Sequence, residues 1–191
     1  MDLSPETLLD IARKYWRADR EYDGRLESPP EYQRFGALWD EKLKGDLQRW
    51  RSFQDALRTE LPGFIIHDGT SSFEGAFRFM AYAVSPRSSP PFRFALVGCL
   101  SVLAPICTVY GVQYDFVGKE RHNPRLSFDP FPPEMSDPAD LIARNLEATF
   151  GVQRLPREVA EFPIPLIVHN KEPPQTTLFH AFFDSQPDNI P

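Results

Sequence analysis

Residues 92–117 read FRFALVGCLSVLAPICTVYGVQYDFV, and this stretch decides the fold class. It contains two runs, 92–103 and 106–117, that are rich in β-branched and aromatic residues and are separated by Ala104-Pro105. Such residues favour strands, and the proline between the runs marks a chain reversal. We therefore predict a central hairpin that is buried on both faces.

The same stretch allows a second interpretation, because residues 94–114 form an uncharged run of 21 residues, long enough to cross a bilayer as a helix. Pro105 in its middle, Gly98, Gly111 and the polar Gln113 near its end all favour strands. The buried hairpin is the preferred prediction, and a membrane-associated protein using 94–114 is the alternative.

Before residue 62, apolar residues recur every three or four positions, which is typical of amphipathic helices. Ser4 as N-cap and Pro5 begin a first helix, which we expect to end near Asp23-Gly24. A second helical region follows Ser28-Pro29-Pro30 and ends at Leu61-Pro62-Gly63. Its apolar stripe comprises Tyr32, Phe35, Trp39, Leu43, Leu47, Trp50, Phe53 and Leu57.

From Phe64 the period changes to 2, and a hairpin is predicted from residues 64–67, an Asp68-Gly69 turn and residues 73–84. We expect a breaker at 85–91 to separate this hairpin from the central one. The side chains predicted to share one face of the second strand are Phe73, Phe77 and Phe79.

After the central hairpin we expect a long loop, 118–136, around a possible edge strand at 125–129. A third helix is predicted to begin with Asp137 as N-cap and Pro138 next, and to stop at Gly151.

The last predicted elements are short. Residues 164–168 form an apolar strand, Thr176-Thr177 cap a final helix, and residues 184–191 form a polar tail. The helix carries Leu178, Phe179, Phe182 and Phe183.

These elements predict one α+β domain spanning residues 1–191, with a mainly antiparallel sheet of about four to six strands. N-terminal helices (1–61) cover the sheet (62–135), and the remainder (136–191) adds a helix, a short strand and a C-terminal helix or tail. A chain of 191 residues that is 41% hydrophobic can bury its own core without metals or disulfides.

The chain offers no assembled catalytic or metal-binding motif. Cys99 and Cys107 lie in the apolar run and are expected to be buried thiols, which suits a reducing cytoplasm. Residues 1–10 lack a basic segment followed by an apolar one, so we expect no secretory signal. The four histidines are scattered, no phosphate-binding glycine pattern occurs, and we expect no cofactor. The enzyme alternative requires a site assembled by tertiary folding around His67, Asp68 and Asp115.

The charge is unevenly distributed along the chain. Residues 1–125 carry 17 Lys+Arg and 17 Asp+Glu, whereas residues 126–191 carry 4 and 10, so the last third accounts for the net charge of −6. An acidic surface repels nucleic acid and anionic membranes and attracts basic proteins. The candidate partner-binding residues lie in and around proline-rich acidic segments: Asp115, Asp129, Glu134, Asp137, Asp140, Asp184 and Asp188.

Four C-terminal segments carry a family resemblance: DLIARNLEATFG (140–151), Leu155-Pro156, Ile164-Pro165 and TLFHAFF (177–183). They resemble the closing part of small bacterial immunity proteins of polymorphic toxin systems. The resemblance covers about a quarter of the chain. It implies an α+β, cytoplasmic, non-catalytic protein that binds a cognate toxin and occludes its active site, and it assigns no individual binding residue. Together with the acidic segments, it predicts an immunity-type inhibitor of a basic toxin domain.

Overall fold

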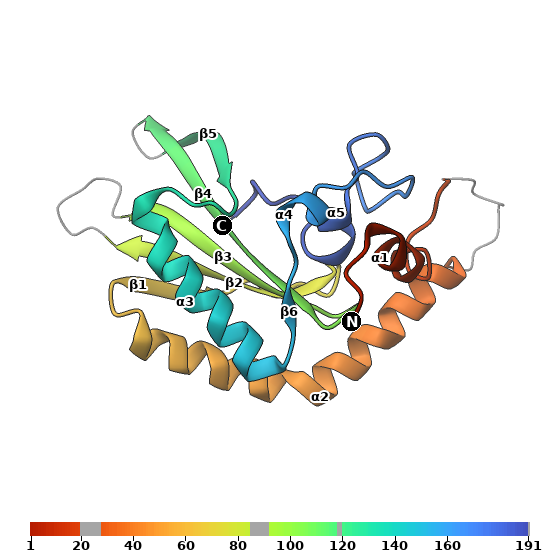
Figure 1. The fold of residues 1–191 in the computed structure, drawn as a ribbon, viewed down its shortest axis with the longest axis horizontal. Helices are drawn as coiled ribbons and strands as arrows, with labels where there is room; N and C mark the ends of the chain where they lie inside the picture. The colour runs from red at the N-terminus through yellow and green to blue at the C-terminus, as the bar shows by residue number, and fades with distance from the viewer. Residues whose placement is uncertain (20–27, 85–91, 118–119, 191) are drawn as a thin grey trace.

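A six-stranded, mostly antiparallel sheet organises the part of the chain that the structure describes, residues 1–19, 28–84, 92–117 and 120–190 of a computed structural model (Figure 1). Five strands follow one another in sequence order, each antiparallel to its neighbour, and β6 pairs parallel with the start of β4. Their bounds are β1 (Phe64–Asp68), β2 (Ala76–Val84), β3 (Phe92–Ser101), β4 (Ile106–Val117), β5 (Glu120–Ser127) and β6 (Gln153–Arg154).

The apolar run 94–114 folds as the predicted central hairpin. Strands β3 and β4 pair antiparallel, with Gly98 opposite Val109 and Leu100 opposite Cys107. Both strands have neighbours on their other sides, so their backbone groups take part in ladders, and most of their side chains are buried. Within the described ranges, no helix has the length and apolar character needed to cross a membrane.

Two long helices, α2 (Pro30–Glu60) and α3 (Pro133–Phe150), cover one face of the sheet (Figure 1). The apolar stripe of α2 supplies Trp50, whose ring centroid lies 5.5 Å from that of Phe77 and 5.8 Å from that of Phe79 on β2. A side chain at Gly98 would collide with the Phe79 ring, because an added Cβ would lie 2.4 Å from it. Glycine on β3 therefore makes room for this aromatic core.

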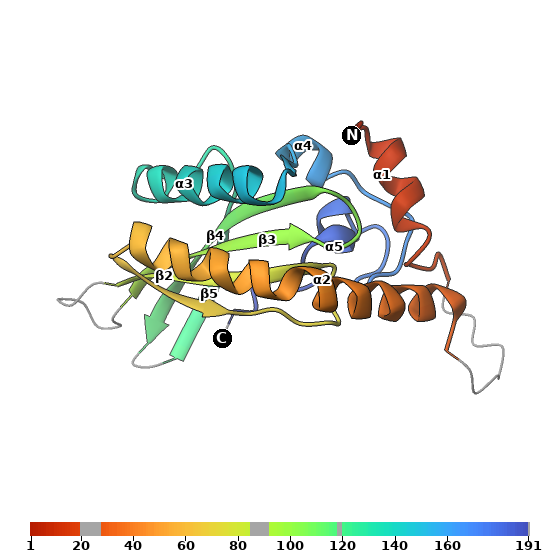
Figure 2. The ribbon, with the colours of Figure 1, turned by 90° about the horizontal axis from the view of Figure 1, so that it is seen from below.

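The opposite face is covered by α5 (Leu178–Phe182), onto which α1 (Pro5–Ala12) packs. The Phe179 ring contacts Tyr110 of β4, with 5.4 Å between centroids, and the Trp16 indole Nε1 donates to the Ala181 carbonyl at 2.9 Å. A short helix, α4 (Arg157–Ala160), precedes this region. Figure 2 shows α2 and α3 as two separate helices that run along the sheet, and α5 at the end of the sheet that lies near α1.

The predicted α+β class and antiparallel sheet are confirmed, but two N-terminal boundaries were wrong. Helix α1 ends at Ala12, and Trp16 turns inward because its indole bonds to Ala181; the predicted end at residues 23–24 lies outside the described residues. Strand β2 begins at Ala76, so Phe73 does not share the face of Phe77 and is 75% exposed in the preceding turn. The predicted breaker at 85–91 also lies outside the described residues.

Three C-terminal predictions were also wrong. The loop 118–136 contains β5, an exposed edge strand that starts at residue 120 instead of 125. Residues 164–168 form only isolated bridges, including Arg17 to Ile167. The expected polar tail lies partly in the core, where Asp184 and Ser185 are 1% and 2% exposed.

Candidate partner-binding surface

Three of the seven candidate acidic residues, Asp115, Asp129 and Asp140, reach solvent but each already contacts an arginine. Asp115 accepts from Arg125 at 2.8 Å and from Asn123 at 3.1 Å, and these hydrogen bonds lower the pKa of its carboxyl. Asp129 and Asp140 both face Arg154, at 3.5 and 3.3 Å. The charge of Asp115 is therefore matched, whereas Asp129 and Asp140 share one arginine and keep one net negative charge between them.

Asp184 was expected on an exposed rim, and that expectation was wrong. Its carboxylate accepts from the Arg78 guanidinium, from the Tyr110 hydroxyl at 2.8 Å and from the backbone N–H of Gln186 at 2.9 Å. Burial opposes the charge of Arg78, yet the Asp184 carboxylate raises the pKa of this guanidinium. Because a buried charge needs a partner, the ion pair between Arg78 on β2 and Asp184 stabilises the packing of the C-terminal segment against the sheet.

Three candidates remain exposed without an ion pair among the described residues: Glu134, Asp137 and Asp188. Asp188 lines an open hollow together with Arg121 and Lys171, so two cations share its surroundings. Glu134 and Asp137 lie elsewhere, on the first turns of α3. The seven residues therefore do not form one acidic surface, and only Glu134 and Asp137 form an unmatched pair.

Glu134 and Asp137 border an apolar groove of about 560 Å³ between α3 and the ends of α2 and the first strands. The Phe64 and Phe94 rings, 6.0 Å apart between centroids, lie edge to face in it. Leu61, at the end of α2, and Ala83, on β2, are each 6% exposed. The groove is lined by Leu61, Gly63, Phe64, Ala83, Val84, Phe94, Glu134, Asp137, Pro138, Leu141 and Arg144. This groove, called the α3 groove below, combines a hydrophobic surface with the carboxylates of Glu134 and Asp137 and, further along α3, the guanidinium of Arg144.

Helix α3 begins a turn earlier than predicted, and this brings Glu134 onto the helix. Pro133, not Pro138, occupies the first helical position, where the missing proline N–H has no helical acceptor to lose. Pro138 therefore lies inside the helix and lacks the N–H that would donate to the Glu134 carbonyl. A backbone acceptor without its usual helical donor thus lies next to the two carboxylates.

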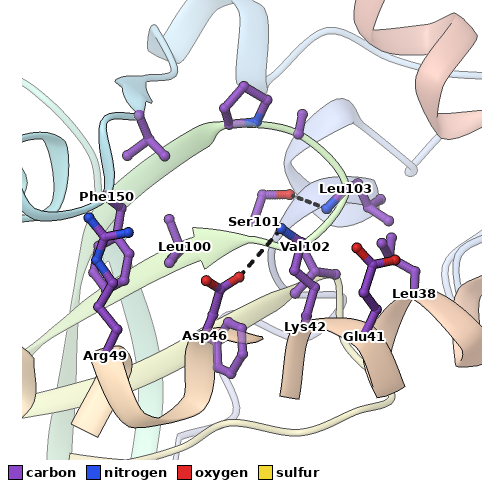
Figure 3. A pocket seen from close by; sticks show the side chains of 14 residues that line it. Leu38, Glu41, Lys42, Asp46, Arg49, Leu100, Ser101, Val102, Leu103 and Phe150 are labelled. Atoms are coloured by element: carbon purple, nitrogen blue, oxygen red, sulfur yellow. Dashed lines mark hydrogen bonds and ion pairs between the residues drawn. The ribbon is translucent and has the colours of Figure 1, made fainter. Parts of the chain in front are cut away.

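A second cleft, of about 380 Å³, lies between α2 and the turn from β3 to β4 (Figure 3). Figure 3 shows Arg49 beside the Phe150 ring, and Lys42 and Asp46 extending from α2 and joined by an ion pair of 3.4 Å. The Ser101 hydroxyl donates to the Gly75 carbonyl at 3.3 Å and accepts from the Leu103 N–H at 3.1 Å. Lys42, Asp46 and Ser101 in this cleft therefore already have partners within the chain.

Sequence reasoning did not identify either cleft. The charged positions 42, 46 and 49 on α2 follow helical spacing, but this pattern is shared by solvated helix faces. Nothing in the sequence predicts which turn of the sheet faces them.

The residues of the enzyme alternative do not come together. His67 and Asp68 lie on β1 at one edge of the sheet, whereas Asp115 lies on β4, with β2 and β3 in between. The Asp68 carboxylate accepts from the Thr70 N–H at 3.1 Å and the Thr70 hydroxyl at 2.7 Å, so it stabilises the turn. The structure does not assemble this proposed catalytic group.

The two thiols are held in their neutral form. Burial raises the pKa of Cys99 well above its ordinary value and raises that of Cys107 to about 12. Neither thiol is therefore an activated nucleophile at neutral pH. In the described ranges no three His, Cys, Asp or Glu residues are grouped as metal ligands.

Comparison of the chain with protein-family models, with curated proteins and with solved structures gives no match.

Proposed function

We propose that this chain is a cytoplasmic, non-catalytic inhibitor of the immunity type, which binds a basic toxin domain and blocks it sterically. One observation carries the proposal: Glu134 and Asp137, exposed and without ion pairs among the described residues, border an apolar groove. Apolar surface contributes binding free energy, and unmatched carboxylates favour basic partners and disfavour acidic ones. The C-terminal resemblance to immunity proteins supports the same function.

Most of the other acidic candidates are less suited to direct contact with a basic partner, because they already have partners or are buried. Asp115, Asp129 and Asp140 each have an arginine within 3.5 Å, and Asp184 is buried. A basic partner would have to displace an existing arginine to contact the first three. The binding energy is therefore expected from the α3 groove, with the other exposed acids affecting mainly the association rate.

The test uses two variants that remove the same charge. E134Q/D137N removes both carboxylates of the groove, and D115N/D129N removes two exposed carboxylates that are paired with arginine. Each immobilised chain is exposed to native lysate at low salt, and the retained basic protein is identified and purified. Its activity is then titrated with each variant.

We expect wild type and D115N/D129N to inhibit the captured protein at a one-to-one ratio, and E134Q/D137N to bind roughly tenfold more weakly or worse. Binding should weaken as salt is raised. Retention that does not depend on salt, or a captured protein whose activity is unchanged by saturating wild-type chain, would show that the proposal is wrong.

A further inference from the structure

We infer that the α3 groove takes an amphipathic α-helix of the partner, with apolar side chains on one face and lysine or arginine at one end. This inference rests on the proposed function and adds the form of the ligand. The groove combines apolar contacts with carboxylates that have no ion pair among the described residues, and the backbone groups of Gly63 and Phe64 that line it are already hydrogen-bonded.

Part of the backbone that lines the groove is already hydrogen-bonded. The Phe64 N–H donates to the Leu61 carbonyl at 3.0 Å, and the Gly63 carbonyl accepts from the Val84 N–H at 3.0 Å. Ala83 on β2 is paired with Phe64 of β1, and Phe94 lies on β3, between β2 and β4. An extended peptide would bury unpaired backbone groups here, whereas a helix satisfies its own.

The wall formed by α3 changes in character along its length. Glu134 and Asp137 occupy its first turns, Leu141 follows one turn later, and Arg144 lies at the far end of the groove. From residue 134 to 144 the helix rises about 15 Å, which matches roughly three turns of a partner helix. Apolar side chains at i, i+3 or i+4, and i+7 of that helix can face Leu141 and the groove beneath it.

The end of the groove at Glu134 and Asp137 offers several hydrogen-bond acceptors to a partner. Besides the two carboxylates, the Glu134 carbonyl has no α-helical donor because residue 138 is proline. Lysine and arginine carry several N–H donors and can satisfy such a group of acceptors. Arg144 at the other end disfavours a second cation there, so the groove distinguishes a helix with basic residues at one end from a uniformly basic helix.

The inference is tested with labelled synthetic peptides and the full chain, by fluorescence anisotropy at low salt. The first peptide is a three-turn helix with leucine on one face and lysine at one end. The second replaces lysine with glutamate, and the third carries proline at a central polar position of the first. We expect the first to bind, the glutamate peptide not to bind, and the proline peptide to bind at least roughly tenfold more weakly.

Variants of the chain test whether the first peptide binds in the α3 groove. E134Q/D137N and Leu141→Lys should each weaken binding of the first peptide at least roughly tenfold, while D115N/D129N should bind as wild type does. Circular dichroism and thermal unfolding verify that each variant is folded. Equal binding of the proline peptide would overturn the helix assignment, and binding unaffected by both groove variants would overturn the location.

The two proposals can fail separately. If E134Q/D137N loses a natural inhibited partner but no helical peptide binds, the proposed function stands and the helix inference is wrong. If the lysine helix binds as described but no captured protein is inhibited, the groove assignment stands and the inhibitor function is wrong.

Discussion

The two faces of the sheet differ in how they use carboxylates from the same acidic third of the sequence. On the α5 face, Asp184 is 1% exposed and accepts hydrogen bonds from Arg78, Tyr110 and Gln186. On the α3 side, Glu134 and Asp137 are exposed and have no ion pair in the described ranges. Whether a carboxylate stabilises the fold or remains available to a partner depends on the cation that the neighbouring strand presents.

The largest expected effect comes from Asp184→Asn, which leaves the Arg78 guanidinium buried without its counter-charge. We expect the free energy of unfolding to fall by about 3–5 kcal/mol, because breaking a buried ion pair from one side leaves an uncompensated charge. Urea denaturation followed by circular dichroism measures the change.

The double variant R78M/D184L tests whether the two charges stabilise the fold as a pair. Removing both charges should restore a substantial part of the lost stability, because apolar groups replace the pair. If R78M/D184L loses as much stability relative to wild type as R78M and D184L lose separately when added together, the two residues are not coupled and the buried Arg78–Asp184 pair does not stabilise the fold as a unit.

A smaller effect is expected at His180 on α5. Burial, assisted by Lys171, lowers the pKa of His180 to about 4, and its Nδ1 accepts from the Thr177 N–H at 3.1 Å. The unfolded chain gains a proton on this side chain near pH 6.5, whereas the folded chain does not until about pH 4. The free energy of unfolding should therefore fall as pH is lowered through this window.

The expected size is roughly 1–2 kcal/mol, because the ring retains some solvent contact. His180→Asn offers the matched control, since its side-chain oxygen can accept from the same N–H without titrating. The difference in stability between wild type and His180→Asn should shrink as pH falls from 6.5 to 4. A difference that is constant over this range would contradict the prediction.

The smallest effect on stability is expected for the carboxylates of the groove. E134Q/D137N should lower the free energy of unfolding by no more than about 1 kcal/mol, because neither residue has an ion pair to lose and only the interaction of Glu134 with the N-terminus of α3 is removed. Binding of a basic partner should nevertheless weaken. Thermal unfolding distinguishes the two roles, and a loss above about 1.5 kcal/mol would assign these residues to the fold.

Much of the fold was predictable from local patterns. The change from helical spacing before residue 62 to alternation after Phe64 indicated a helical region followed by a sheet, and Pro105 marked the reversal between β3 and β4. Strand β5 was placed too late because all its residues except Ser127 are exposed, so no buried face imposes an apolar alternation. Pro124 within it also argued against a strand.

The candidate site was predictable only in part. The acidic composition of the last third identified Glu134 and Asp137, but it could not separate them from Asp184. The partner of Asp184 is Arg78, 106 positions earlier, and the partner of Asp140 is Arg154 on β6, 14 positions later. Such pairings depend on how segments meet in three dimensions, and the apolar half of the groove depends on the ends of three strands meeting a helix.

The hydrogen bond from Trp16 to the Ala181 carbonyl joins segments 165 positions apart. During synthesis the antiparallel meander can pair as soon as β4 leaves the ribosome, but Tyr110 and its neighbours remain uncovered until residues 178–190 follow. A chain that has made strands β1 to β4 but not residues 178–190 would therefore leave the Tyr110 face of the sheet open to solvent. Covering that face therefore needs residues 178–190, which are far in sequence from the strands and from the helix α1 that they contact.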